Sequence, residues 1–302
     1  MHTGITILFF ISGILAALGL AISDSTLDAL GVDITPPRRR GVMQGVAWGF
    51  RGLGAGIAGI LVGFLADLNQ WFFIFGVPGV IFSIVAFTVV LFKENPLPEP
   101  FKRIPGATYR TVFGNKGVQL TILFQLLSGM GIAILSVMQT FFYEDLAYTN
   151  FFIGLLFAGF GAGMLIGGVG FGTLGDRLKV QNVLILTTIL YMALILSVLI
   201  LPIWVFEVAL PLFFAVGIIN GGYEATQLRI GMENSPGILS GTVFNLYASM
   251  SNIGQIAIGA ILIGLVASFT NFSIGWQIAW VFLLIALPIG LVLARRIGKS
   301  KE

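Results

Sequence analysis

The residue in this sequence whose chemistry most needs explaining is an arginine inside an apolar stretch. Arg51 lies about ten residues into the run 41–66, which holds no other charge. A charge this deep in a membrane span costs at least about 2.5 to 3.5 kcal/mol on insertion scales unless it is paired or faces water. Counting back 14 residues from the turn near Pro37 gives Ser23, next to Asp24, at the same depth as Arg51, and Asp28 lies about one helical turn nearer the turn. We therefore predict an Arg51–Asp24 ion pair, with Asp28 as the second choice, acting either as a fixed brace or in a substrate or proton path.

A second set of polar residues lies in later apolar stretches. Glu224 is the best candidate for proton coupling because burial favours the neutral form of a carboxyl group. The alternative is a position at the membrane interface, from which its side chain reaches the headgroups. The nearby asparagines are Asn220, Asn245 and Asn252. Polar groups in spans bond across helices or line cavities, and Gln125 and Gln139 are further candidates for hydrogen bonding toward a central cavity.

The residue types that are scarce exclude several kinds of chemistry. The chain has no cysteine, and its single histidine is His2. Disulfides, thiolate metal sites and histidine clusters are therefore excluded, and we predict no cofactor or metal. One alternative remains, because Asp24, Asp28 and Asp33 resemble the carboxylates with which membrane prenyltransferases hold magnesium and diphosphate. Against it, no second aspartate-rich motif follows near a later loop.

Composition places these residues in membrane-spanning helices. The 302 residues are 57% hydrophobic and only 10% charged, with a mean hydropathy of +1.00. About a quarter of the residues of a soluble domain are charged, so this composition indicates an integral membrane protein. Breaking the apolar runs at charged or Pro/Gly/Asn clusters predicts an all-α polytopic protein of nine spans. The expected spans are 4–30, 41–66, 71–92, 117–143, 151–173, 181–201, 203–227, 238–268 and 275–294.

The basic residues predict the orientation of the chain. Nearly all of the 16 Lys and Arg residues, Arg229 among them, fall in alternate loops or in the C-terminal tail. The positive-inside rule places those segments in the cytoplasm, with the N-terminus outside and the C-terminus inside a plasma membrane. This explains the net charge of +3 by topology, so we expect a lipid bilayer and no nucleic acid as partner.

One loop is much longer than the others and predicts the domain organisation. Segment 93–116 combines basic residues with several prolines, a composition typical of a semi-rigid linker. It separates a partial N-terminal bundle of three spans, 1–92, from a C-terminal bundle of six spans, 117–302.

An internal repeat relates the two bundles. An offset of 200 residues superposes Gly41, Gly54 and Gly59 on Gly241, Gly254 and Gly259, and both copies follow a turn that contains proline. Six spans per repeat indicates two parallel six-helix halves, an arrangement found in secondary transporters.

The loop after the fifth span resembles the signature G-x-L-a-D-R-x-G-R-K of the major facilitator superfamily. The matching residues are Gly172, Leu174, Gly175, Asp176 and Arg177. Residues 179–181 depart from it, reading Lys-Val-Gln where Gly-Arg-Lys is usual. The resemblance assigns the nine spans to helices four through twelve of a twelve-helix fold, so three N-terminal helices are absent. A mis-called start, a break in the gene and a separate polypeptide are the three explanations left open.

The resemblance also implies a function. It is that of a secondary active transporter moving a small solute by alternating access, with protons or sodium as candidate coupling ions and an unidentified substrate. Asp176 would cap the helix that begins near Ser240 and so form a conformational switch loop with its neighbours. A nontransporting or truncated member of the family is the remaining alternative.

Glycines at four-residue spacing predict a close helix contact. The second span carries a series that includes Gly52 and Gly56, and the fifth span carries Gly159, Gly163 and Gly167. The resemblance implies that these two helices face each other across the two halves, where glycines would form a smooth sliding surface.

Overall fold

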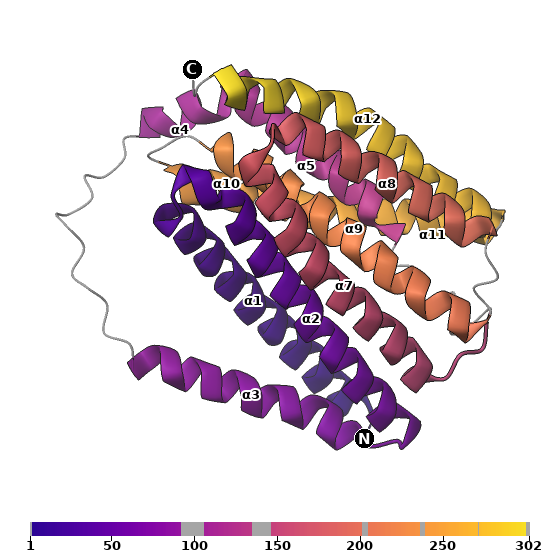
Figure 1. The fold of residues 1–302 in the computed structure, drawn as a ribbon. Coiled ribbons are helices and arrows are strands. Elements are labelled where there is room, and N and C mark those ends of the chain that lie inside the picture. The colour runs from indigo at the N-terminus through magenta and orange to yellow at the C-terminus, as the bar shows by residue number, and fades with distance from the viewer. Residues whose placement is uncertain are drawn as a thin grey trace.

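The computed structural model describes residues 2–91, 106–134, 146–200, 205–235, 239–270 and 272–299, and within these ranges the chain is helical without strands (Figure 1). The elements are α1 (His2–Ile34), α2 (Arg40–Asp67), α3 (Trp71–Leu91), α4 (Gly106–Phe113), α5 (Lys116–Ile132), α7 (Asn150–Arg177), α8 (Val180–Ile200), α9 (Phe206–Glu233), α10 (Ser240–Asn252), η3 (Ile253–Gly259), α11 (Ala260–Phe269) and α12 (Phe272–Lys299).

The helices follow the predicted spans closely, and the polytopic all-α class is confirmed. Seven stretches of the described residues are long and apolar enough to cross a membrane. They lie in α1, α2, α7, α8, α9, the continuous α10–η3–α11 rod and α12. The described part of α3 gives a shorter apolar helix, and the predicted fourth span, 117–143, extends past α5 into residues outside the described ranges. The count of nine is therefore not confirmed.

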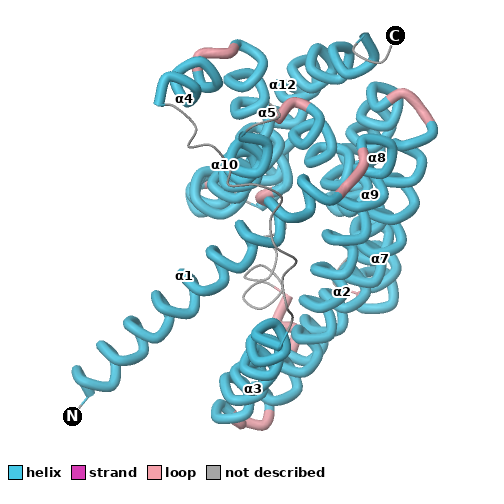
Figure 2. The backbone as a smooth tube through the Cα atoms, turned by 90° about the vertical axis from the view of Figure 1, so that its left-hand side faces the viewer, coloured by secondary structure: helices cyan, strands magenta, loops and turns pink. Residues whose placement is uncertain are grey.

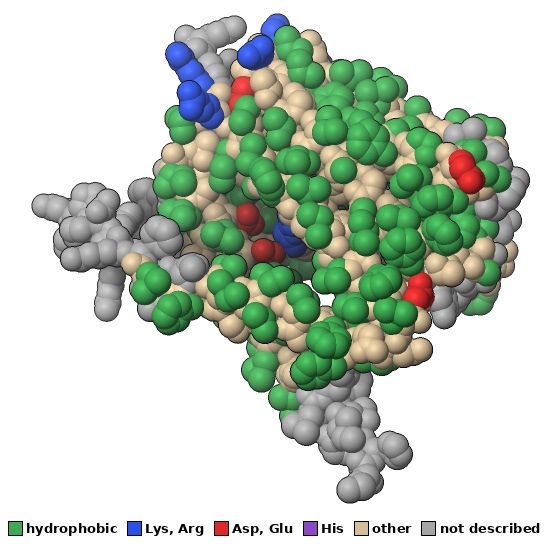
Figure 3. Space-filling view, turned by 60° about the horizontal axis from the view of Figure 1, so that its bottom comes forward, with side chains coloured by type: hydrophobic (Ala, Val, Ile, Leu, Met, Phe, Trp, Pro, Cys, Tyr) green, Lys and Arg blue, Asp and Glu red, His purple; other side chains and the backbone are tan. Residues whose placement is uncertain are grey.

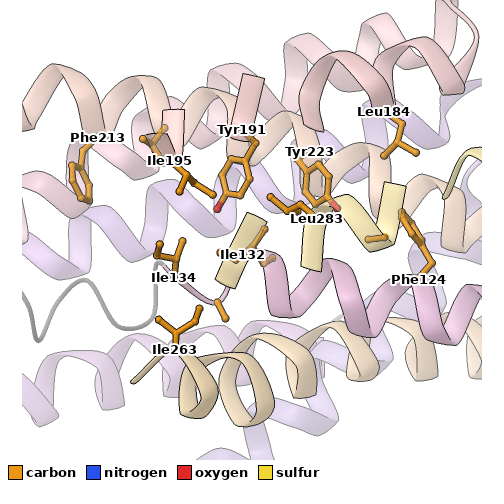
Figure 4. Close-up of a cluster of buried hydrophobic side chains, with 14 of the residues drawn as sticks. Phe124, Ile132, Ile134, Leu184, Tyr191, Ile195, Phe213, Tyr223, Ile263 and Leu283 are labelled. Atoms are coloured by element: carbon orange, nitrogen blue, oxygen red, sulfur yellow. The ribbon is translucent and has the colours of Figure 1, made fainter. Parts of the chain in front are cut away.

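Most of the buried apolar side chains after residue 116 form one large cluster. Buried side chains from α5, α7, α8, α9, α11 and α12 pack together, and Figure 4 shows part of this cluster. Tyr191 of α8 and Tyr223 of α9 stack at its centre, with ring centroids 5.8 Å apart. The Tyr223 hydroxyl donates to Ser128 Oγ of α5 at 2.9 Å, which joins a third helix to the pair. Burying the rings while bonding the hydroxyl is how tyrosine is accommodated in apolar surroundings.

The first three helices are less enclosed. Helix α2 packs against α7 along its length, whereas α1 contacts α10 with its C-terminal part and its N-terminal part extends away from α10 (Figure 2). Large apolar side chains of α1 and α3, such as Leu15 and Phe82, are exposed. In a bilayer such faces meet lipid chains, so exposure of this kind carries no penalty.

Glycines hold α2 and α7 at backbone contact, as predicted for α2. A Cβ atom built on Gly45 would overlap the carbonyl oxygen of Gly168, and one on Gly52 would lie 2.7 Å from Met164 Sδ. Gly41 meets Gly172 near one end, and Gly63 meets Asn150 at the other. The two helices are therefore antiparallel and in contact from end to end, a closeness that only glycine permits.

The predicted partner of the α7 glycines is wrong. Gly159, Gly163 and Gly167 face α9, where Cβ atoms on the last two would overlap the backbone at Phe214 and Ile218. A different set on α7, Gly154, Gly161, Gly168 and Gly172, meets α2. Helix α7 thus has two faces of small residues about half a turn apart. A glycine at every fourth position identifies one face but does not tell which neighbouring helix that face meets.

Candidate functional site

A cavity of about 340 Å³ lies between α2 on one side and α7, α9 and the α10–η3 rod on the other. This volume is within the range of small-molecule sites. Its apolar wall includes Trp48, Phe157, Phe160, Met164 and Ile256. Its polar lining consists of Arg51, Asn220, Glu224, Asn252 and Gln255. The predicted residues Arg51, Asn220 and Glu224, which come from two distant parts of the chain, therefore line one cavity.

The predicted ion pair of Arg51 is present. Arg51 Nη2 lies 3.2 Å from Asp24 Oδ2, which joins α2 to α1, and the guanidinium lies 4.7 Å from the centre of the Trp48 ring. Both charged side chains are partly exposed, at 48% and 36%. Figure 3 shows acidic and basic side chains together in a hollow on a face that is otherwise rich in hydrophobic side chains. Pairing and cation–π contact together lower the cost of placing this charge at membrane depth.

Glu224 is buried in the wall of the cavity, which does not fit the alternative of a side chain reaching out to the headgroups. Its side chain is buried, and its Oε1 accepts a hydrogen bond of 3.1 Å from Asn220 Nδ2, one helical turn earlier on α9. Glu224 Oε2 and Asn220 Oδ1 are also buried and have no hydrogen-bond partner. Buried acceptors without a donor are costly, so this pair is a place where a bound donor would be stabilised.

The other predicted site residues lie elsewhere. Asp28 is on α1 within electrostatic reach of Asp24 and Arg51, and Asn245 of α10 donates to the Ser25 carbonyl at 2.8 Å. Gln125 is buried between α5 and α9, where its side chain exchanges hydrogen bonds with Gln227 at 3.0 and 2.6 Å. It therefore joins helices instead of lining the cavity. Gln139 lies outside the described residues.

A π-helical segment supplies a polar group that the sequence analysis missed. In η3 the helix widens, and Asn252 and Gln255 at its start line the cavity. Gly254 and Gly259, five residues apart, both pack against α5. π segments occur often at functional sites because they change which residues face a neighbour. The glycine spacing of five is the one signal in the sequence that points to it.

Asp176 caps a helix, but not the predicted one. Its two carboxylate oxygens accept hydrogen bonds of 2.9 Å each from the backbone N–H groups of Gly41 and Val42, in the first turn of α2. The expectation of a cap on the helix starting at Ser240 is wrong. Asp176 lies in the last turn of α7, beside the start of the antiparallel helix α2, so its carboxylate reaches α2 and not α10. Helix α2 has no side-chain cap of its own, and Asp176 fills that place.

A buried arginine supports this cap. Arg229 Nη1 lies 3.2 Å from Asp176 Oδ1, and its Nη2 lies 3.9 Å from Glu233, one turn later on α9. Arg40 of α2 reaches Glu233 at 3.5 Å and donates to the Met232 carbonyl at 3.2 Å. The prediction of Arg229 as a loop residue is wrong, because α9 continues to Glu233 and the Arg229 side chain is only 4% exposed. Glu233 at the fourth position after Arg229 was the available sequence signal.

The remaining residues of the predicted switch loop surround Asp176. Gly172 allows the backbones of α7 and α2 to meet beside the cap, and a Cβ on Gly175 would lie 2.9 Å from Arg229 Nη1. Arg177 is exposed in the last turn of α7. The two glycines therefore make room for Asp176 and Arg229, while Arg177 has no contact of this kind.

The opposite end of the α2–α7 pair carries a second cap of the same design. Asp67, the last residue of α2, accepts hydrogen bonds from Asn150 Nδ2 at 2.9 Å and from the Phe151 N–H at 3.0 Å, in the first turn of α7. Each helix therefore ends in an aspartate that caps the start of the other. A carboxylate at a helix C-terminus is unfavourable for its own macrodipole and favourable for its neighbour's N-terminus, so both aspartates gain from this pairing.

Comparison with known proteins agrees with this arrangement of helices. The sequence profile described as Major Facilitator Superfamily matches residues 1–258. No curated protein matches the chain significantly. A profile match over most of the chain, together with the apolar helices and the cavity between two groups of helices, identifies the chain as a member of the Major Facilitator Superfamily and a multi-pass membrane transporter.

Proposed function

We propose that this protein is a secondary active transporter that carries a small solute through the membrane by alternating access. Segments 1–92 and 117–302 act as the two bundles, and 93–116 is the linker between them. The observation that carries this proposal is the cavity, whose walls come from α2 of the first bundle and from α7, α9 and η3 of the second. A site between two bodies is exposed to either side of the membrane when the bodies rock against each other.

The α2–α7 contact supports such a movement. Glycine backbones meet along its length and offer few interdigitating side chains, while polar contacts concentrate at the two ends, at Asp176 and at Asp67. Opening one end of the pair requires the loss of one cap and leaves the other in place. We propose that these caps are the contacts that break in turn during transport, with the Asp176 end facing the cytoplasm.

Two roles within the cavity follow from its contacts. Glu224, buried and lacking a donor for one oxygen, is the proposed site for a coupling proton or for a cation. Arg51 has two open roles, a brace between α1 and α2 or a part of the path. If it is a brace, Arg51→Met destabilises the protein and a second change, Asp24→Asn, restores stability, because the carboxylate left without its partner is then removed as well. If Arg51 is instead part of the substrate or proton path, the double variant is stable, but spin labels on it no longer show exchange between two distances.

Distance measurements by electron spin resonance test alternating access. The chain has no cysteine, so label pairs can be introduced without removing native residues. Exposed positions at one end are Arg39 and Lys179, and at the other Leu68 and Val205. In lipid nanodiscs we expect two distance populations for each pair. Conditions that lengthen one pair should shorten the other. A single unchanged distance at both ends, in the wild type and in Asp176→Asn, would contradict the proposal.

The prenyltransferase alternative gains no support from a specific observation. The side chain of Asp33 is not among those that the structure describes. Among the described residues, no group of three or more acidic or histidine side chains is placed to hold a metal ion. Asp24 is instead engaged with Arg51.

A further inference from the structure

The cavity has two hydrogen-bond acceptors that the protein itself leaves unused. Asn220 donates its amide N–H to Glu224 Oε1 at 3.1 Å, and this fixes the orientation of both side chains. The atoms left over are Asn220 Oδ1 and Glu224 Oε2, and both are buried without a partner. The two residues are only 1% and 5% exposed, and both line the cavity. A ligand that satisfies these atoms must donate hydrogen bonds.

The charges around the cavity indicate the sign of that ligand. Arg51 is the cationic group in the lining, but it forms its ion pair with Asp24 at 3.2 Å and lies over Trp48. Among the described residues Glu224 forms no salt bridge. Arg51 also attracts Asp28 and, at longer range, Glu224, so three carboxylates share this one cation and an ionised Glu224 is not compensated. A cation placed against it gains in a desolvated site far more than it would in water.

The rest of the lining indicates an organic ligand rather than a bare metal ion. Phe157, Phe160 and Met164 of α7 form an apolar wall, and Trp48 and Ile256 extend it. Small-molecule sites combine such a wall with a few convergent polar groups. A sodium ion would gain nothing from the apolar wall. An amine with a hydrocarbon part can pack against the wall and donate hydrogen bonds to the two acceptors at the same time. The volume of about 340 Å³ limits the ligand to a small molecule.

We infer that this cavity binds a small organic cation, a protonated amine whose N–H groups donate to Glu224 Oε2 and Asn220 Oδ1 while its hydrocarbon part lies against Phe157 and Phe160. The inference rests on the proposed function, because it names the substrate class of the same cavity. Glu224 and Asn220 of α9 would then recognise the charge of the ligand, and the aromatic side chains of α7 would recognise its shape.

Binding of 2-phenylethylammonium to the full chain in nanodiscs tests the inference. Titration calorimetry against protein-free nanodiscs removes the contribution of partitioning into lipid. Two probes of nearly the same shape serve as comparisons, the neutral 2-phenylethanol and the anion phenylacetate. We expect the ammonium to bind at least about tenfold more tightly than either, since a charged hydrogen bond to a buried carboxylate is lost with both. Equal affinity for the alcohol, or preference for the anion, overturns the inference.

Variants locate the binding. Glu224→Gln keeps the shape and the contact with Asn220 but removes the charge, and we expect it to weaken binding by about tenfold or more. The matched control is Glu207→Gln, an exposed carboxylate on the same helix outside the cavity lining, which should leave affinity unchanged. Equal losses in both variants overturn the inference, as does competition by sodium chloride that potassium chloride does not reproduce.

The binding experiment and the distance measurements test different claims, so the substrate class and the transport cycle can be contradicted independently. If 2-phenylethylammonium does not bind while the label pairs still exchange between two distances, the proposed transport cycle stands and the substrate class is wrong. If it binds while the distances never change, the cavity is a cation site in a protein that does not alternate.

Discussion

The two ends of the α2–α7 pair use the same cap in very different surroundings. At one end Asp176 is nearly buried and is held by Arg229, which Glu233 and Arg40 support in turn. At the other end Asp67 is exposed and contacts only the start of α7 in the hydrogen bonds that it accepts. A backbone cap is worth about 1 kcal/mol, whereas leaving a buried charge unpaired costs several times more. The Asp67 end is therefore the weaker of the two, and the difference comes from the charges behind the cap and not from the cap itself.

The largest effect is expected from Asp176→Asn. The amide keeps the size of the side chain but leaves Arg229, which is 4% exposed, with only the more distant carboxylate of Glu233, at 3.9 Å, in place of Asp176 at 3.2 Å. Breaking a buried pair on one side typically costs about 3 to 5 kcal/mol, so we expect a loss of that order in the free energy of unfolding. Unfolding by denaturing detergent in mixed micelles measures it. A loss below about 1 kcal/mol would mean that the Asp176 end is held no better than the Asp67 end.

A second substitution at the same end separates the charge from the cap. In Asp176→Asn with Arg229→Met, no unpaired guanidinium remains, because the arginine is replaced by an apolar side chain of similar length. We expect the double variant to recover at least about half of the stability that the single change loses. If the double variant is as unstable as the sum of both single variants, the two residues do not act as a pair.

Between the two ends, the glycine contact should respond to the smallest possible side chain. A methyl group at Gly45 would overlap the Gly168 carbonyl, whereas Gly54 on the same helix has no neighbouring atom within 4 Å. Overpacking of this kind costs about 1 to 3 kcal/mol, so Gly45→Ala should lower the melting temperature by several degrees. Gly54→Ala, the matched control, should leave it unchanged or raise it slightly, because alanine is the better helix former. Equal behaviour of the two variants would show that α2 and α7 are not in backbone contact.

The comparison also shows what the sequence could and could not predict. Equal depth on two neighbouring helices was enough to predict the Arg51–Asp24 pair, since it depends only on helical rise and one turn. Glu224 and Asn220 are four residues apart and meet for the same local reason. Only the Arg229–Glu233 contact is local in this way. Asp176 meets the start of α2 and Arg229 of α9, and no spacing within one helix reveals these contacts. Gln255 depends on a π segment, whose widening shifts every later side chain relative to a regular helix.

The fold was more predictable than these contacts, because apolar length sets the spans. Apart from the fourth span, which runs beyond the described residues, the predicted bounds agree with the helices to within about six residues. Which helices meet is a different question. Gly159 and Gly161 lie on the same helix only two residues apart, yet the first faces α9 and the second faces α2. A helix in the middle of a bundle has small residues on several faces, so periodicity identifies contacts without assigning them.

The smallest effect is expected at the other end, from Asp67→Asn. The amide oxygen can still accept the Phe151 N–H, but the amide nitrogen cannot accept from Asn150 Nδ2, so Asn150 must turn its own amide to keep that contact. The main loss is then the attraction between a full charge and the N-terminus of α7. That attraction is worth about 0.3 to 1 kcal/mol at an exposed helix end, which corresponds to about a two- to fivefold shift between two states. For the label pair at Leu68 and Val205, we expect the longer-distance population to grow by that factor, while the pair at Arg39 and Lys179 shifts toward the shorter distance. Because Asp176→Asn is the same chemical change at the other end of the same helix pair, the ratio of the two effects measures how much of the asymmetry is due to Arg229. Equal effects from the two variants would show that the charges behind Asp176 add nothing to the cap, and the two ends would then be equivalent.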